Sequence, residues 1–112
     1  MLVMLVAALL LNATIAAEPD PALVEKGQQV LAGANPKCTF CHQIAGKGNP
    51  RSKLDGVGAR LSAEDIKAWI RTPKEIAEKT GSKAQPAMPP YVKEKLSDED
   101  LEALTAYLRS LK

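Results

Sequence analysis

The feature that most constrains this chain is a Cys-x-x-Cys-His motif formed by Cys38, Cys41 and His42. This spacing is used for the covalent attachment of haem. The two thiols lie three residues apart, so they fit one turn of helix and can add to the two vinyl groups of the porphyrin. The next residue then directs an imidazole at the iron. Because haem is a large, flat and apolar group, we expect the rest of the chain to fold around it.

The second iron ligand is predicted by elimination. His42 is the only histidine in the sequence, so it cannot occupy both faces of the iron. Haem iron also accepts a methionine opposite a proximal histidine. Met1 and Met4 lie in an apolar N-terminal stretch, which leaves Met88. Three prolines in residues 85–91 exclude helix and stiffen the backbone around Met88, which suits a weak ligand. The alternative is that Met88 only fills the core.

The N-terminal stretch has the character of an export signal. Residues 1–17 contain no charged side chain, and polar sequence begins at Glu18. The apolar run has about the length of a signal-peptide core, and Ala16 and Ala17 offer a cleavage site. No Lys or Arg precedes the run, which departs from the usual pattern. The competing interpretation is an uncleaved membrane anchor, for which the run is at or just below the usual length of about 17–25 residues.

The remainder of the chain, roughly 95 residues, is small for a core made only of aliphatic side chains. Its aromatic residues are Phe40, Trp69, Tyr91 and Tyr107. A buried haem would compensate for this shortage. Both cysteines belong to the attachment motif, so no disulfide framework is expected.

The distribution of charge is a weaker indication of the kind of partner that the protein binds. The formal net charge is +2. Basic residues flank the motif at Lys37, Lys47, Arg51 and Lys53, and acidic residues begin the last predicted helix at Asp98, Glu99, Asp100 and Glu102. A basic rim would orient the molecule toward an acidic face of a partner, although an ordinary solvated surface explains the same pattern. A nucleic-acid partner is not expected, because it would require a stronger and more contiguous basic stripe.

Capping signals predict an all-α protein with four helices. The first begins after Asp20 at Pro21 and ends at Gly33, and the second begins with a capping box at Ser62 and stops before Pro73. The third runs from Pro73 to near Gly81, and the fourth begins at Ser97 and carries a leucine stripe to Leu111. Residues 45–59 are rich in glycine and are predicted to be loop. No segment shows sustained period-two alternation, so no sheet is predicted.

In this order, the features resemble a class I c-type cytochrome, a small monohaem electron carrier of bacterial periplasms. The resemblance spans about residues 21–112 and implies a cytochrome c domain over residues 18–112, located in the periplasm. It also implies that the first and last helices cross, with Gly27 and Leu31 against Leu104 and Tyr107. Only glycine lets two helix backbones approach so closely.

The resemblance assigns further residues to the haem pocket. Leu54 begins a loop that is similar to the one under the haem edge, and Arg60 matches an arginine near a propionate. The family commonly has a proline where this chain has Ser52, whose carbonyl is expected to accept the proton of the His42 imidazole. Trp69 matches an aromatic residue near the distal ligand, although a plain core role explains it equally well.

The resemblance implies a one-electron carrier and not an enzyme. It implies one haem c, bound through Cys38 and Cys41 with His42 and Met88 as axial ligands, and a monomer that meets redox proteins at an exposed haem edge. Membrane contact is expected only if the N-terminal segment remains. The main alternative is a five-coordinate haem sensor or peroxidase, in which Met88 does not bind. A dithiol oxidoreductase would need a βαβ context, and three adjacent zinc ligands cannot close a tetrahedral site.

Overall fold

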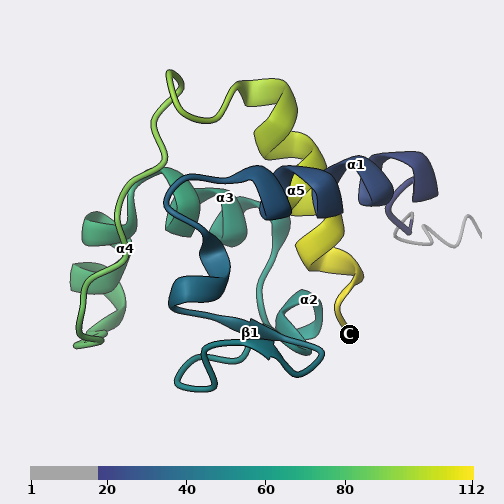
Figure 1. The fold of residues 1–112 in the computed structure, drawn as a ribbon. Coiled ribbons are helices and arrows are strands. Elements are labelled where there is room, and N and C mark those ends of the chain that lie inside the picture. Colours follow the sequence, from purple (N-terminus) through teal and green to yellow (C-terminus); the bar gives the residue numbers. More distant parts are fainter. Residues whose placement is uncertain (1–17) are drawn as a thin grey trace, which may run out of the picture.

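A computed structural model of the chain describes residues 18–112 (Figure 1). The predicted signal peptide or anchor, residues 1–17, lies outside the described residues. Within residues 18–112, no helix has the length and apolar character needed to cross a membrane.

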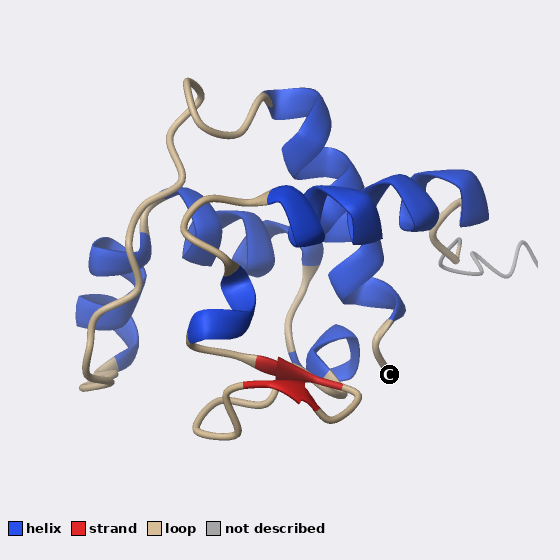
Figure 2. Ribbon diagram, in the orientation of Figure 1, coloured by secondary structure: helices blue, strands red, loops and turns tan. Residues whose placement is uncertain are grey.

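The described part of the chain is mainly helical, which confirms the predicted all-α class (Figure 2). The elements, in order, are α1 (Pro21–Gly33), the 3-10 turn η1 (Cys38–Phe40), β1 (Gln43–Ile44), β2 (Lys47–Gly48), α2 (Val57–Arg60), α3 (Ala63–Arg71), α4 (Pro73–Thr80) and α5 (Asp98–Ser110). The four predicted helices correspond to α1, α3, α4 and α5.

Three of the four predicted helix starts, those of α1, α3 and α5, are confirmed by side-chain caps. Asp20 accepts a hydrogen bond from the amide of Ala22 at 3.0 Å, and the Ser62 hydroxyl accepts one from the amide of Asp65 at 3.1 Å. The Ser97 hydroxyl does the same for α5. These contacts satisfy amide donors that the first turn of a helix leaves free.

Two predictions about the segment after the motif are wrong. We predicted no sheet, but β1 and β2 form a small antiparallel pair with Ile44 opposite Lys47. We predicted loop over residues 45–59, but the segment also contains β2 and most of α2. Two-residue strands and a one-turn helix are too short to produce a periodic sequence pattern. The turn that joins the strands has Ala45 and Gly46 at positive φ, as tight hairpin turns require.

Helices α1 and α5 cross at a point where their backbones almost touch (Figure 1). A Cβ atom on Gly27 would lie 1.9 Å from the carbonyl oxygen of Ala103 and 2.7 Å from the Cβ of Tyr107. The crossing predicted at Gly27 and Tyr107 is therefore confirmed. Leu31 and Leu104 belong to the same buried cluster beside it.

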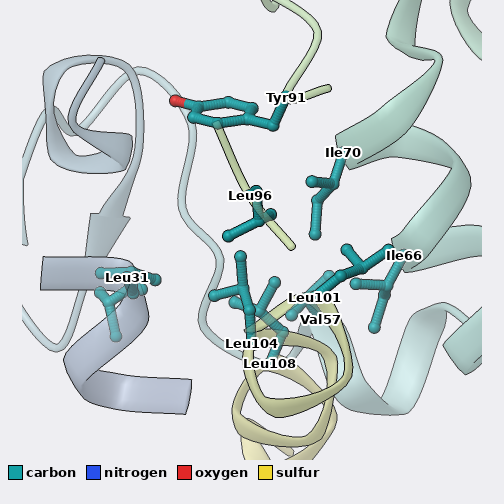
Figure 3. Close-up of a cluster of buried hydrophobic side chains, with 10 residues drawn as sticks. Leu31, Val57, Ile66, Ile70, Tyr91, Leu96, Leu101, Leu104 and Leu108 are labelled. Carbon is teal, nitrogen blue, oxygen red and sulfur yellow. The ribbon is translucent and has the colours of Figure 1, made fainter. Parts of the chain in front are cut away.

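The core gathers side chains from α1, β1, α2, α3, α5 and the segment before α5 (Figure 3). Its buried members are Leu31, Ile44, Val57, Ile66, Ile70, Tyr91, Leu96, Leu101, Leu104 and Leu108. Figure 3 shows Tyr91 at one end of this cluster, above Leu96. The cluster therefore joins the two crossing helices to α3 and to the segment before α5.

Candidate functional site

The Cys-x-x-Cys-His motif folds as one helical turn. The carbonyl of Cys38 accepts hydrogen bonds from the amides of Cys41 and His42, at 3.2 and 2.9 Å. Cys38 is half-buried and Cys41 is exposed, and both thiols are free. The single turn that the spacing predicts is therefore present, and it places two thiols and an imidazole together.

All eight predicted site residues line one cavity of about 1,520 Å³. They are Cys38, Cys41, His42, Ser52, Leu54, Arg60, Trp69 and Met88. Typical small-molecule pockets measure about 300–1,000 Å³, so this one is large for a chain of this length. Because the eight residues come from segments far apart in the sequence, the fold brings the predicted site together.

The lining of the cavity fits a large apolar group. It consists mainly of apolar side chains, including the core residues Leu31, Ile66 and Leu104. These core residues therefore face the cavity as well as one another. An apolar group that filled the cavity would bury their remaining exposed surface and stabilise the fold. Two thiols and one imidazole at its wall supply the chemistry needed to hold a haem.

His42 is oriented by Ser52. Its Nδ1 lies 2.9 Å from the Ser52 hydroxyl oxygen, while the Ser52 carbonyl accepts a hydrogen bond from the Gln43 amide at 2.8 Å. We expected the carbonyl alone to hold the ring, so the hydroxyl is a contact that the sequence prediction missed. Burial lowers the pKa of His42, and the Ser52 backbone partly opposes this effect. A neutral ring that donates from Nδ1 keeps its Nε2 lone pair for a metal.

The Cys38 thiol is not set up as a redox nucleophile. Burial raises its pKa, and the nearby Tyr91 side chain opposes this only in part. Reactive cysteines of dithiol oxidoreductases have lowered pKa values, because the thiolate is the reacting species. The environment of Cys38 therefore favours the attachment role over the dithiol alternative.

Met88 lies in the segment between α4 and α5, which we call the strap (residues 82–97). Its side chain is half-buried, packs against the core and lines the same cavity as His42. It also lines a smaller cavity of about 120 Å³, together with Cys38 and Cys41. The thioether is therefore available to the space that the imidazole faces.

The remaining predicted residues occupy the cavity wall in different ways. Trp69 and Leu54 are half-buried, and Leu54 packs against the core. Arg60 is exposed, and its Nη1 donates to the carbonyl of Asp55 at 3.0 Å. Arg60 is therefore partly occupied by its own loop, and its other donors are available at the rim of the cavity.

Asn49 and Tyr91, which were not among the predicted site residues, brace the motif. The side-chain amide of Asn49 donates to the carbonyl of Phe40 at 3.0 Å, and its backbone amide lies 3.1 Å from the carbonyl of His42. The Tyr91 hydroxyl donates to the carbonyl of Pro36, across 55 residues of sequence. For Asn49, the sequence gives no indication of this role. For Tyr91, the only indication is its position three residues after Met88, the predicted ligand, and directly after Pro89 and Pro90.

Comparison with known proteins gives the family. The cytochrome c family model matches residues 24–112. The chain is also 34% identical over 104 residues to a protein described as cytochrome c oxidase subunit 2, from Alkalihalophilus pseudofirmus. This match covers 85% of the present chain but 28% of that relative. No solved structure matches the chain. Its sequence, its helical fold and its motif-lined cavity agree with the family match: the chain belongs to the cytochrome c family, as a class I c-type cytochrome.

Proposed function

We propose that this protein carries single electrons on one haem c, attached through Cys38 and Cys41 and coordinated by His42 and Met88. The observation that carries the proposal is that these four side chains line one mainly apolar cavity. When bound, the haem supplies a one-electron ferric/ferrous couple. The chain supplies its attachment, its axial ligands and its surroundings.

The residues around the site favour fast transfer at a raised potential. The His42 ring is held by Ser52, so it keeps its orientation through repeated transfers. Apolar walls keep water out and disfavour the extra positive charge of the ferric state, and a thioether ligand acts in the same direction. No proton transfer to a substrate is required, and the chain has no second histidine to act as an acid or base.

The partner is proposed to be another redox protein that meets the turn carrying the motif. This turn lies at the surface, where Phe40 is 67% exposed and Cys41 is exposed. The four flanking basic residues, Lys37, Lys47, Arg51 and Lys53, are all exposed and favour an acidic partner face. Since one relative is a cytochrome c oxidase subunit 2, we include a terminal oxidase in the class of partners. The carrier is proposed to act as a monomer in short-lived complexes.

Localisation is also a proposal. The uncharged stretch over residues 1–17 supports export to the periplasm, followed by cleavage near Ala17 or retention as an anchor. The intact mass of the protein isolated from the periplasmic and membrane fractions distinguishes these outcomes. A haem-loaded protein found only in the cytoplasm contradicts export.

Spectra and potentials of the holoprotein and of Met88→Ala test the ligation. A thioether bound to ferric haem gives a weak long-wavelength absorption band, which we expect in the wild type and not in Met88→Ala. The potential of the variant falls, because a stabilising ligand of the ferrous state is lost. Val92→Ala, in the same strap at a side chain that is 42% exposed, is the control and keeps both properties. Identical low-spin spectra for the wild type and Met88→Ala contradict the assignment. Carbon monoxide binding to the wild type without ligand loss supports the five-coordinate alternative.

A further inference from the structure

The strap is weakly held around Met88. Within residues 18–112, no backbone hydrogen bond joins residues 83–90 to any other segment. The position of the Met88 thioether therefore depends on the stiffness of the neighbouring backbone and on the next anchored residue. Pro89 and Pro90 provide the stiffness, because their rings fix φ. The next anchored residue is Tyr91, three positions after Met88.

Tyr91 is fixed by contacts in three directions. Its amide donates to the carbonyl of Ile70 at 2.9 Å, and its own carbonyl accepts from Nη1 of Arg71 at 2.8 Å. Its hydroxyl donates to the carbonyl of Pro36, close to the motif. The side chain is 6% exposed and joins the buried cluster (Figure 3). One residue therefore ties the strap to α3 and to the segment that precedes the two cysteines.

Arg71 extends this anchor to the start of α5. Besides Tyr91, its Nη1 donates to the carbonyl of Leu96 at 2.6 Å, and its Nη2 lies 2.9 Å from Oδ1 of Asp98. The Arg71 side chain is 18% exposed, whereas that of Asp98 is 68% exposed. Charge-assisted bonds to two carbonyls in a partly buried place are stronger than an exposed ion pair. The carbonyl contacts therefore carry most of the interaction, and the fork of the guanidinium makes them possible.

We infer that Arg71 is a positioning residue for Met88, acting through Tyr91. The inference rests on the proposed coordination by His42 and Met88. A thioether is a weak ligand, so its retention depends on how little conformational freedom the strap regains when the ligand leaves. With Tyr91 held, Pro89 and Pro90 transmit that constraint to Met88. Without the guanidinium, the end of the strap moves more freely and Met88 leaves the iron more often.

Imidazole binding to the ferric holoprotein measures this effect, because imidazole competes with the Met88 thioether. Arg71→Lys keeps the positive charge but cannot bridge two carbonyls and a carboxylate. We expect it to bind imidazole about tenfold more tightly than the wild type, and to show a weaker thioether band. Met88→Ala gives the upper limit of affinity. Asp98→Asn removes only the exposed ion pair with Arg71 and changes the affinity for imidazole by no more than about twofold.

Lys67→Gln is the matched control. Lys67 is on α3, as Arg71 is, and it pairs with Glu102 of α5 and makes no hydrogen bond or ion pair with the strap in the described part of the chain. A merely structural role for Arg71 would lower the melting temperature and leave imidazole affinity unchanged, as we expect for Lys67→Gln. Wild-type affinity and an intact thioether band in Arg71→Lys overturn the inference.

Two further results separate the inference from the proposed ligation. If Met88→Ala binds imidazole no more tightly than the wild type, the ligation by Met88 is wrong, and the role of Arg71 falls with it. If Met88→Ala binds tightly and Arg71→Lys does not, only the role of Arg71 is wrong. Should Arg71→Lys yield no holoprotein, Arg71→Gln, whose side-chain amide can donate to one of the two carbonyls, takes its place. We then expect about threefold tighter imidazole binding than in the wild type, and unchanged affinity overturns the inference.

Discussion

The α1–α5 crossing and the strap are held in opposite ways. At the crossing, two capped helices meet backbone to backbone at Gly27, and Lys26 pairs with Glu99 at 2.7 Å across them. In the strap, residues 83–90 lack backbone hydrogen bonds to the rest of the described chain and depend on prolines and on Tyr91. We therefore expect the crossing to determine the free energy of unfolding, and the strap to determine how firmly Met88 is held on the iron.

We expect the largest effect, a loss in the free energy of unfolding, from a substitution at the crossing. In Gly27→Ala, the added Cβ would lie 1.9 Å from the carbonyl oxygen of Ala103, so the helices must move apart. We expect urea unfolding of the holoprotein to show a loss of about 3 kcal/mol or more.

Gly33→Ala is the control for this change. Gly33 ends α1, and nothing lies within 4 Å of the position where its Cβ would be. Its free energy of unfolding should change by less than about 1 kcal/mol. Equal losses in the two variants would show that close approach at Gly27 does not determine stability.

A change in the strap should give the reverse pattern. Pro89→Ala restores freedom to the backbone beside Met88, so Met88 leaves the iron more easily. We expect about threefold tighter imidazole binding to the ferric holoprotein, with less than about 1 kcal/mol change in unfolding free energy. A large loss of stability with unchanged imidazole affinity would show that the strap, like the crossing, determines the stability of the fold and not the retention of Met88.

On the His42 side of the haem, we expect a smaller effect, a change in the reduction potential. Ser52→Ala removes the hydroxyl that lies 2.9 Å from Nδ1 of His42 and leaves the nearby backbone carbonyl. The imidazole becomes a slightly weaker donor to the iron, which disfavours the ferric state. We expect the potential to rise by roughly 20 mV in a redox titration, with Ser62→Ala, at the α3 cap, as the control. A fall in potential would contradict the role given to the hydroxyl.

We expect the smallest effect, a pH-dependent change in stability, from the ion pair between Lys26 and Glu99 at the crossing. A hydrogen bond from Lys26 lowers the pKa of Glu99 below its ordinary 4.5. The folded state therefore favours the carboxylate, and the pair adds stability above about pH 4.5 that is lost as the pH falls through the lowered pKa. Glu99→Gln should be slightly less stable than the wild type near pH 7, and this difference should vanish once the pH is below the lowered pKa of Glu99, as measured by urea unfolding. A difference that persists at the lower pH would exclude the charge as its cause.

The sequence predicted what depends on local signals. The motif at residues 38–42 and the caps at Asp20 and Ser97 each follow from a few neighbouring residues, and the structure agrees with them. The close approach at Gly27, which the structure also confirms, came from the family resemblance and not from a local pattern. The ligation itself remains a prediction, although the cavity brings its four residues together.

What the sequence did not predict depends on distant contacts or on very short elements. Arg71 reaches carbonyls 20 and 25 residues away, and no local pattern marks those partners. The β1–β2 pair is too short to alternate, and it places residues 47–48 beside the motif. The Ser52 hydroxyl was overlooked because only its carbonyl was expected to matter.

The most direct test of the account is the proton NMR spectrum of the ferrous holoprotein. The ring current of a haem shifts the methyl protons of an axial methionine far upfield, because they lie over the face of the porphyrin. We predict one three-proton signal in that region for the wild type and none for Met88→Ala. A wild-type spectrum with the Met88 methyl at the position of an ordinary methionine would contradict coordination by His42 and Met88.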